Sequence, residues 1–536
     1  VIGIMGIEMA GGVYCPLSPR DPEHRLHALT QQTQSHFVLV HNLTKTKFDH
    51  DIVSLDIDSV LSINDIEKKD LSSVIMKGEE IAYIIFTSGS TGTPKAVQVR
   101  HQNFIDCINS LVYINSFNKD DTVVQMTRCS FDIHVQEILG TLLIGGTLIM
   151  LHPGGTIDFD YLSKVLQSKQ ITYMHTVPSF LHMFFIFIEQ NKNINAIKYL
   201  RSLCSIGEAF VVHLIDLVIK SGITNCIVWN LYGPAETTIV STFHRVDLIK
   251  DTRSVSIGRP LSNYRCMIMN QYLQLSVTDE EGELCVGGVG VFAGYLGRDD
   301  LTAKALLEVD GKLFYRTGDL VRIDNNSLLH YQGRKDHQIK LHGQRIELGE
   351  IEQCLLRTSI SACVVIKWKD DYLIAYAQSS HVNEEQLHQH CQSHLPPHMI
   401  PSFFIILDKL PLNQNGKIDR KLLPPPSFLS LTDNINHNLP RNTLEQKLQN
   451  IFSQALHIES PHVEVPFGQL GGTSLDAIFV LTLIRQQICN KVDISLLFTN
   501  PSIRQLAQAI EPVLSFEELQ DIASTVNEIH ETNVHL

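Results

Sequence analysis

Thr87-Ser-Gly-Ser-Thr-Gly-Thr-Pro-Lys95 is the most informative stretch of the chain, and it directly follows an apolar, β-branched run at Ile81–Phe86. Small residues let backbone N–H groups close around phosphate oxygens, hydroxyl groups add donors, and a lysine supplies positive charge. A flexible Ser/Gly linker would need neither a buried strand before it nor a proline-stiffened lysine after it. A P-loop would need Gly-Lys-Ser/Thr, whereas Pro94 precedes this lysine. The stretch therefore predicts a phosphate-binding loop that follows a strand.

The surroundings of this loop predict an α/β fold. Up to about residue 325, short β-branched runs such as Gly146–Met150 and Ile227–Leu231 alternate with longer helical patterns. Alternation of this kind predicts βαβ units and covered, largely parallel sheets. A second unit begins near Gly333 and contains the strand-like runs Ala362–Ile366 and Tyr372–Tyr376. These runs indicate a small α+β domain.

The last third of the chain has a different pattern. Residues 427–440 are polar and bounded by prolines, which is typical of a linker. Apolar residues with helical spacing follow at Leu444, Leu448 and Ile451, and again in Leu475–Ile488 and Ile503–Ile510. This periodicity predicts a bundle of helices, followed by a polar tail.

Composition excludes several classes of protein. The 536 residues predict two or three domains, and the formal net charge of -14 gives no electrostatic footprint for nucleic acid or an anionic membrane. The eleven cysteines are scattered without a CxxC pair, which favours a reducing compartment and a cytoplasmic protein. The longest apolar run, Ile138–Leu151, is shorter than the roughly 20 residues of a membrane helix and is expected to be buried core. The opening Val1–Met5 has no basic segment before it, so we expect a clipped chain start rather than a signal peptide.

In order along the chain, further motifs resemble those of the adenylate-forming (AMP-binding) superfamily. This superfamily includes acyl-CoA synthetases, luciferases and peptide-synthetase adenylation domains. Besides the phosphate loop, the matching stretches are Gly11–Leu17, Asn230–Thr238, Tyr315–Asp319, Gly333–Lys340 with Gly343–Glu352, and Asn415–Lys417. The resemblance covers nearly all of the chain and implies a large multi-sheet adenylation domain with a small α+β C-terminal subdomain. The family's first motif and roughly a hundred preceding residues have no counterpart, so we expect the N-terminal part of the large domain to be missing.

The resemblance implies a site for ATP and Mg²⁺. Lys417, Thr237 and Lys95 would be catalytic: Lys417 would bridge the substrate carboxylate and the α-phosphate, and Thr237 would contact that phosphate. Tyr232 would stack on adenine, and Glu236 would bind Mg²⁺. The nucleotide-binding residues implied are Thr87, Ser88, Gly89, Ser90, Thr91, Gly92, Gly207, Glu208, Asn230, Tyr232, Gly233, Glu236, Asp319 at the ribose hydroxyls, and Arg334. Asp336 would be the hinge about which the small subdomain rotates.

Ser130-Phe-Asp-Ile-His-Val-Gln-Glu137 resembles the motif that begins the pocket for the carboxylic acid. In peptide-synthetase domains the aspartate at the position of Asp132 pairs with the substrate α-ammonium group, which suits a buried carboxylate. The remaining lining residues implied are Ile133, Gln136, His175, Cys204, Ile206, Leu231, Ile239 and Val240. Gln136 and His175 could bond a polar substrate side chain or bond each other, so the specificity stays open.

Phe467–Asp476 resembles the attachment motif of a phosphopantetheine carrier domain, with Ser474 as the attachment residue. The serine is expected at the start of a helix, where a phosphodiester is favoured by free N–H groups. Thr473 replaces the His or Asp usual in this place. The resemblance implies an all-α four-helix carrier domain that carries 4'-phosphopantetheine and is modified by a phosphopantetheinyl transferase.

Together these features predict activation of an amino acid with ATP and its loading as a thioester onto Ser474, as in a non-ribosomal peptide synthetase, where further modules are possible partners. The alternatives are an acyl-CoA synthetase acting on another carboxylic acid, and a catalytically inactive member of the fold. The domain boundaries expected are 1–335 for the large subdomain, 336–426 for the small one, 427–440 for the linker, 441–513 for the carrier and 514–536 for the tail.

Overall fold

The protein's structure, a computed structural model, forms two compact units. The described residues are 1–48, 52–62, 74–89, 92–270, 272, 274–275, 280–336, 338–341, 343–368, 372–413, 418–425, 439–456, 458–468, 470, 472, 474–489, 492, 496–497, 500 and 502–514. The first unit comprises Val1–Met150, Val165–Thr358 and Glu385–Ile400, and the second comprises Leu151–Lys164, Ser359–Glu384 and Pro401–Leu536. Ser90, Thr91, Lys417 and most of the predicted linker and tail lie outside the described residues.

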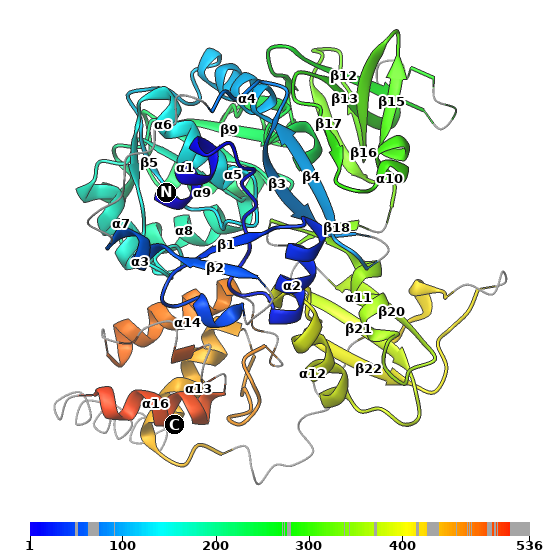
Figure 1. Cartoon of the computed structure of the whole chain (residues 1–536). Helices are drawn as coiled ribbons and strands as arrows, with labels where there is room; N and C mark the ends of the chain where they lie inside the picture. Colours follow the sequence, from blue (N-terminus) through cyan, green and yellow to red (C-terminus); the bar gives the residue numbers. More distant parts are fainter. Residues whose placement is uncertain are drawn as a thin grey trace. The chain divides into compact units, whose positions relative to one another are not determined.

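The first unit is built on a seven-stranded sheet of order β11-β10-β9-β8-β7-β5-β6 (Figure 1). Its parallel strands are β5 (Thr122–Val124), β6 (Thr147–Ile149), β7 (Tyr173–Thr176), β8 (Ser202–Ser205) and β9 (Ile227–Tyr232). The connections between these strands contain helices α7 (Phe159–Ser168), α8 (Pro178–Gln190) and α9 (Val212–Lys220), as the βαβ pattern predicted. β10 (Thr242–Arg245) and β11 (Arg259–Pro260) complete the sheet in antiparallel pairing.

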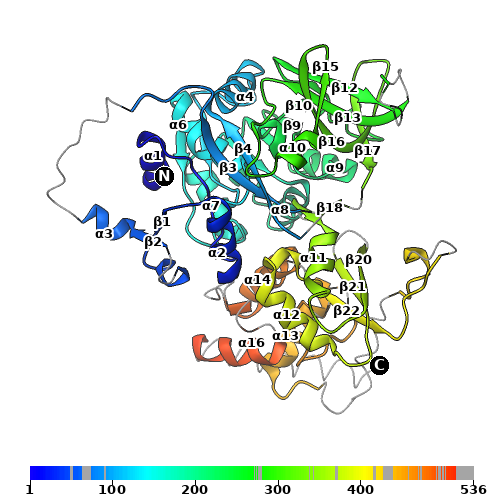
Figure 2. The ribbon, with the colours of Figure 1, turned by 45° about the vertical axis from the view of Figure 1, so that its right-hand side comes forward.

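The expectation of largely parallel sheets is wrong for the other two larger sheets of this unit. Strands β12 (Tyr264–Met269), β13 (Glu281–Gly288), β15 (Leu306–Val309), β16 (Lys312–Ile323) and β17 (Leu329–Arg334) form an antiparallel sheet, drawn in green in Figures 1 and 2. Another antiparallel sheet joins β3 (Ile81–Thr87), β4 (Lys95–Arg100) and β14 (Gly294–Tyr295). Several of these strands are joined by connections too short for a parallel crossover.

Shorter elements complete the first unit. β1 (Phe37–Val40) and β2 (Val53–Asp56) pair in parallel, while β18 (Gln338–Leu341) and β19 (Gln344–Glu347) form a hairpin. The further helices are α1 (Ile2–Met9), α2 (Glu23–Gln32), α3 (Ile57–Leu61), α4 (His101–Tyr113), α5 (Ile133–Val135), α6 (Thr141–Ile144), α10 (Asp299–Ala305), α11 (Leu348–Leu355) and α12 (Glu384–His394). One buried core, which includes Val97, Val123, Trp229 and Leu284, joins the seven-stranded sheet to the two antiparallel sheets.

The apolar run Ile138–Leu151 is buried only in part, which corrects the expectation. Ile138 lies in the core, whereas Leu142 and Leu143 are 40% and 56% exposed on α6. The run changes from helix to the edge strand β6, so only some of its side chains face the core and the others face solvent. In the described part of the chain, no helix combines the length and the apolar character needed to cross a bilayer.

The second unit contains a small sheet and a set of helices. β20 (Ala362–Trp368) pairs antiparallel with β21 (Tyr372–Gln378), which pairs in parallel with β22 (Phe403–Leu407). Both strands predicted in this segment are confirmed. Among the described residues its α-helices include α13 (Thr443–Leu456), α14 (Ser474–Gln487) and α16 (Ile503–Ile510). They bury the apolar residues that the helical spacing selected, such as Leu448 and Ile503.

Candidate functional site

The candidate residues gather where parallel strands end. His175, Cys204 and Leu231 are the penultimate residues of β7, β8 and β9, respectively. The register pairs His175 with Cys204, and Ser205 with Asn230. Because the carboxyl ends of parallel strands meet at one edge of the sheet, these side chains share one place in the fold, where α/β sheets bind ligands.

The predicted phosphate loop joins two antiparallel strands, since Thr87 pairs with Lys95 across β3 and β4. Gly89 is required here, because a Cβ atom on it would lie 1.9 Å from the carbonyl oxygen of Thr93. Its N–H donates to Glu350 at 3.1 Å. The Ser88 hydroxyl donates to the carbonyl of Arg345 at 3.0 Å and accepts from the N–H of Glu347 at 3.2 Å.

Asp319 is the centre of a buried polar cluster. β16 and β17 pair it with Arg334, whose Nη1 donates to Asp319 Oδ1 at 2.9 Å. The hydroxyl of Tyr232 donates to Asp319 Oδ2 at 2.5 Å. A carboxylate has about four acceptor positions, so each oxygen keeps one for a further donor such as a ribose hydroxyl. The structure thus brings together three residues that the sequence placed in separate motifs.

Arg334 also connects this cluster to the predicted hinge. Its Nε and Nη2 donate to the two carboxylate oxygens of Asp336 at 2.9 and 2.6 Å. Burial opposes charge on Arg334, but Asp336 and Asp319 outweigh it and raise the pKa of the guanidinium. The pKa of Asp336 is lowered, because Arg334 outweighs the effect of burial. Asp336 is therefore held as an ion pair, in a bidentate geometry that favours a fixed position.

Glu236 lies next to a second cation. It is fully buried, and Arg345 Nη1 donates to its two oxygens at 3.1 and 2.9 Å while Tyr295 donates at 2.8 Å. Burial would raise the pKa of Glu236, but Arg345, Lys95 and Tyr295 outweigh it and lower the pKa to about 2. Lys95 Nζ lies 3.8 Å from Glu347 and 5.6 Å from the centroid of the Tyr295 ring. The carboxylate of Glu236 is thus ionised in the folded protein.

Sequence reasoning missed the partners of these residues. Arg345, Glu347 and Glu350 belong to a motif that was recognised without roles for its members, and Tyr295 was not singled out. Lys340 was also missed, and its ammonium group lies 5.4 Å from the centroid of the Tyr232 ring, whose face the prediction gives to adenine. The motif itself was the sequence signal that could have pointed to these residues. The hairpin of β18 and β19 brings Arg345 of this motif to Glu236.

The other predicted nucleotide residues are mostly engaged within the protein. Glu208 accepts from the N–H and hydroxyl of Ser179 at 2.9 and 3.0 Å and from the N–H of Gly343 at 2.5 Å, and Gly207 before it has a φ of +91°. Asn230 donates to the Ser256 carbonyl at 2.8 Å. Thr237 is fully buried, with its hydroxyl 2.5 Å from that of Ser241. Gly92 and Gly233 lie outside helices and strands, and the nucleotide roles of all these residues remain predictions.

Asp132 is held by a strained turn. Its Oδ2 accepts from the N–H of Ile239 at 3.1 Å. Thr238 and Ile239 have φ values of +59° and +64°, which cost about 1–3 kcal/mol each for residues other than glycine. Burial raises the pKa of Asp132 to about 6, with Glu236 adding to the rise and the Ile239 N–H opposing it. Strain of this size is typical of functional sites.

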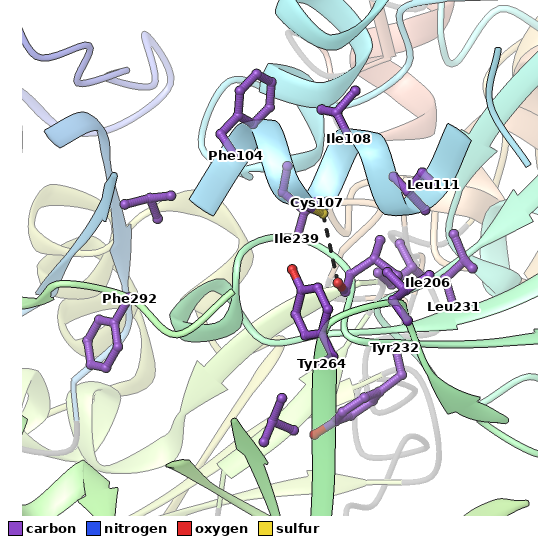
Figure 3. Close-up of a cluster of buried hydrophobic side chains, with 14 of the residues drawn as sticks. Phe104, Cys107, Ile108, Leu111, Ile206, Leu231, Tyr232, Ile239, Tyr264 and Phe292 are labelled. Carbon is purple, nitrogen blue, oxygen red and sulfur yellow. Dashed lines mark hydrogen bonds between the residues drawn. The ribbon is translucent and has the colours of Figure 1, made fainter. Parts of the chain in front are cut away.

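The apolar pocket candidates pack together. Figure 3 shows Ile239 beside Cys107 of α4, and Ile206 with Leu231 below Leu111 of the same helix. Cys107 Sγ lies 3.8 Å from the carbonyl oxygen of Val240. Ile206, Leu231, Ile239 and Val240 are all at most 3% exposed. Ile133 packs against the same core. These residues form an apolar wall next to Asp132.

Gln136 and His175 are joined through a residue that the sequence did not select. Gln136 Nε2 donates to the hydroxyl of Tyr173 at 2.7 Å, and this hydroxyl lies 3.3 Å from His175 Nδ1. All three side chains are fully buried. The alternative of direct bonding between Gln136 and His175 is therefore replaced by an indirect connection.

Ser474 is the first residue of α14, as predicted for a residue at the start of a helix. Lys417 lies outside the described residues, and so do Ser90 and Thr91 of the phosphate loop. No cysteine of the described residues forms a disulfide bond.

Comparison with known families gives three matches in order. The family described as AMP-binding enzyme matches residues 1–296, the AMP-binding enzyme C-terminal domain matches residues 350–417, and the phosphopantetheine attachment site matches residues 446–510. The order is the one that the motifs predicted.

Comparison with individual proteins agrees. Bacitracin synthase 1 of Bacillus licheniformis is 33% identical over 95% of this chain and 10% of its own length, and tyrocidine synthase 3 of Brevibacillus parabrevis is 33% identical over 95% of the chain and 8% of its length. The chain thus spans about a tenth of such relatives. A solved structure of holo-PA1221, described as an NRPS protein containing adenylation and PCP domains, superposes with a TM-score of 0.76 at 22% identity over 95% of this chain and 85% of that one. At this identity the likeness supports the fold.

Proposed function

The chain belongs to the AMP-binding family of adenylate-forming enzymes and carries a phosphopantetheine attachment domain behind the catalytic part, and from this we propose that it activates an amino acid with ATP and loads it onto Ser474. The observation that carries the proposal is the polar cluster of Tyr232, Asp319 and Arg334, in which Tyr232 ends the parallel strand β9. The charges of Lys95 and Arg345 act on Glu236, and the charge of Arg345 also acts on Arg334. The cluster supplies an acceptor for the ribose and charge for the phosphates at one place.

In the proposed first reaction, a carboxylate oxygen of the amino acid attacks the α-phosphate of ATP, and pyrophosphate leaves. Such a transfer depends on positioning and charge neutralisation. Asp319 would accept both ribose hydroxyls, Tyr232 would stack on adenine, and Lys95 with the loop of residues 87–92 would hold the leaving pyrophosphate. Thr237 and Lys417 would stabilise the charge on the α-phosphate, with Lys417 as a mobile point charge. Asp132 would bind the α-ammonium group.

Glu236 fits a Mg²⁺ ion by its chemistry, since it is an ionised oxygen ligand in a buried place. Bound there, the ion would supply charge neutralisation at the phosphates. Tyr295 and Arg345 now occupy three of the about four acceptor positions of the Glu236 carboxylate, so we propose that Arg345 withdraws with β18 and β19 when the nucleotide and metal bind. The pivot of this movement would be Asp336.

The second reaction would transfer the acyl group to the carrier arm. The 4'-phosphopantetheine bound at Ser474 would supply a thiol that accepts the acyl group as AMP is released. An acceptor on the same chain has an effective concentration on the order of millimolar. The partners proposed are the phosphopantetheinyl transferase that installs the arm and further synthetase modules. The proposed domains are 1–335, 336–426 and 441–513, and each of the three family matches lies within one of them.

The test of the proposal is ATP–pyrophosphate exchange by the whole chain with Mg²⁺ and each amino acid in turn. Exchange that depends on one or a few amino acids supports it. Absence of exchange with every amino acid, together with activity towards another carboxylic acid and free CoA, would favour the acyl-CoA synthetase alternative.

Replacing Asp319 by asparagine is expected to weaken ATP binding. The amide keeps the shape but loses the charge that would accept two ribose hydroxyls, and hydrogen bonds to a charged group contribute about 1.5–3 kcal/mol each. We expect the KM for ATP to rise on the order of 100-fold in pyrophosphate exchange, with a much smaller change in the KM for the amino acid. Equal increases in both KM values would contradict a role at the ribose.

The pH dependence of amino acid binding is expected to follow Asp132. Its raised pKa of about 6 means that the carboxyl group is ionised above pH 6 and neutral below it. Because only the carboxylate attracts an α-ammonium group, kcat/KM for the amino acid at saturating ATP should fall tenfold per pH unit below about 6. The Asp132→Asn variant should lack this limb of the profile. A wild-type profile that is flat between pH 7 and 5 would overturn the assignment.

A further inference from the structure

Gln136, Tyr173 and His175 form a buried polar row whose two ends have no partner. Within the described residues, Gln136 Oε1 and His175 Nε2 make no hydrogen bond although both atoms are buried. A buried polar atom left without a hydrogen bond costs about 1–3 kcal/mol. Two such atoms at the two ends of one row point to a ligand that completes them.

The hydroxyl group of Tyr173 determines which end of the row is a hydrogen-bond donor and which is an acceptor. The hydroxyl accepts from Gln136 Nε2, so its own proton goes to His175 Nδ1. Burial lowers the pKa of His175 to about 3, so the ring carries one proton, which must then be on Nε2. The row therefore ends in an acceptor, Gln136 Oε1, and a donor, His175 Nε2–H.

The row ends in one donor and one acceptor in either orientation of the Gln136 amide. If its oxygen and nitrogen are exchanged, every bond in the row reverses, and the ends become a donor on Gln136 and an acceptor on His175. Cys204 also lies within hydrogen-bonding reach of the Tyr173 hydroxyl. A thiol sulfur is a weak acceptor compared with an imidazole nitrogen, so the hydroxyl proton stays with His175.

The row adjoins the proposed amino acid site. Asp132 begins the helical segment that contains Gln136, so the two residues are one turn apart and share a face. His175 pairs in register with Cys204, and Ile206 of the apolar wall follows β8. The two open ends therefore lie among the residues that would surround the substrate side chain.

We propose that the activated amino acid has a side chain that ends in an amide or a hydroxyl, which both donates to and accepts from the ends of this row. The proposal rests on the proposed function and names the substrate class of that site. An apolar side chain would leave both ends unpaired, a carboxylate could only accept, and an ammonium group could only donate. Tyr173 acts as a positioning residue, because its hydroxyl sets the polarity of Gln136 and His175.

The test compares amino acids of matched size in pyrophosphate exchange by the whole chain. The sets are glutamine with methionine and glutamate, asparagine with leucine and aspartate, threonine with valine, and lysine and ornithine as amines. A site built to bond a polar group rejects analogues that lack the group by large factors. We expect the preferred amide or hydroxyl acid to exceed its apolar match by at least about 100-fold in kcat/KM. Preference for an apolar acid, a carboxylate or an amine overturns the proposal.

Two variants test the row itself. Gln136→Met removes one end at similar size, and Tyr173→Phe removes only the bridging hydroxyl. Both should reduce the ratio of kcat/KM between the polar and apolar acids at least about tenfold, whereas Gln389→Met, on the exposed face of α12, should leave it unchanged. Equal losses for both acids in Tyr173→Phe would show a purely structural role and contradict the proposal.

Thermal unfolding with each amino acid separates this inference from the proposed function. A ligand that binds the folded state raises the unfolding temperature with its concentration. Selective stabilisation by amide or hydroxyl acids without any exchange would overturn activation but support the side-chain inference. Exchange confined to apolar acids would support activation and overturn the inference.

Discussion

Replacing Ser474 by alanine is expected to abolish acylation of the chain completely and to leave ATP–pyrophosphate exchange unchanged. The hydroxyl oxygen of this residue is the proposed attachment atom, so its removal leaves no place for the phosphopantetheine arm. Ser474 opens α14 within the segment that matches the phosphopantetheine attachment site. The exchange reaction ends with the adenylate and needs no arm. The measurement is intact-protein mass after treatment with a phosphopantetheinyl transferase, and then with ATP and the amino acid.

The matched control for this variant is Ser502→Ala in the same helical domain. Ser502 caps α16 through the N–H of Gln505, and loss of such a cap costs about 1 kcal/mol. This variant is therefore less stable but keeps the attachment hydroxyl, and it should still be modified and acylated. Modification of Ser474→Ala at another residue would contradict the assignment. Loss of acylation in both variants would indicate that the domain, rather than the hydroxyl, was affected.

Replacing Glu236 by glutamine is expected to reduce both stability and activity. The change leaves Arg345, 19% exposed, without the carboxylate that now compensates its charge. Removal of one partner of a buried ion pair costs about 3–5 kcal/mol, and the partial exposure of Arg345 favours the lower end. We expect the unfolding temperature to fall by roughly 5 °C or more in a thermal scan without ligands. Loss of the proposed Mg²⁺ ligand should lower exchange on the order of 100-fold and raise the Mg²⁺ concentration needed for half-maximal rate.

The control for this variant is Glu308→Gln, on the exposed side of β15. Both changes remove one negative charge, but a substitution on the surface stays within about 0.5 kcal/mol. A Glu236→Gln protein with unchanged stability would contradict the ion pair with Arg345. A protein with reduced stability but an unchanged requirement for Mg²⁺ would contradict the metal role and leave the structural role in place.

Much of the fold followed from local patterns. β-Branched runs predicted β3, β9 and β21, and apolar residues at helical spacing predicted α13 and α16 close to their observed bounds. The antiparallel sheets were not predicted, because the direction in which two strands pair depends on the connection between them and on which neighbour each one finds. The local sequence also predicted burial of Leu142 and Leu143, which are apolar but exposed.

The candidate site also had features that local sequence predicted and features that it did not predict. The sequence by itself determined the chemistry available at Ser474, Asp132 and the loop before Lys95, because motifs of fixed spacing carry particular side chains on particular elements. Only the tertiary structure decided which charges face each other: Arg345 against Glu236, Arg334 between Asp319 and Asp336, and Tyr173 between Gln136 and His175. The partners in these contacts come mostly from separate strands and loops. Such contacts form when strands pair and cores pack, which no local pattern of residues records.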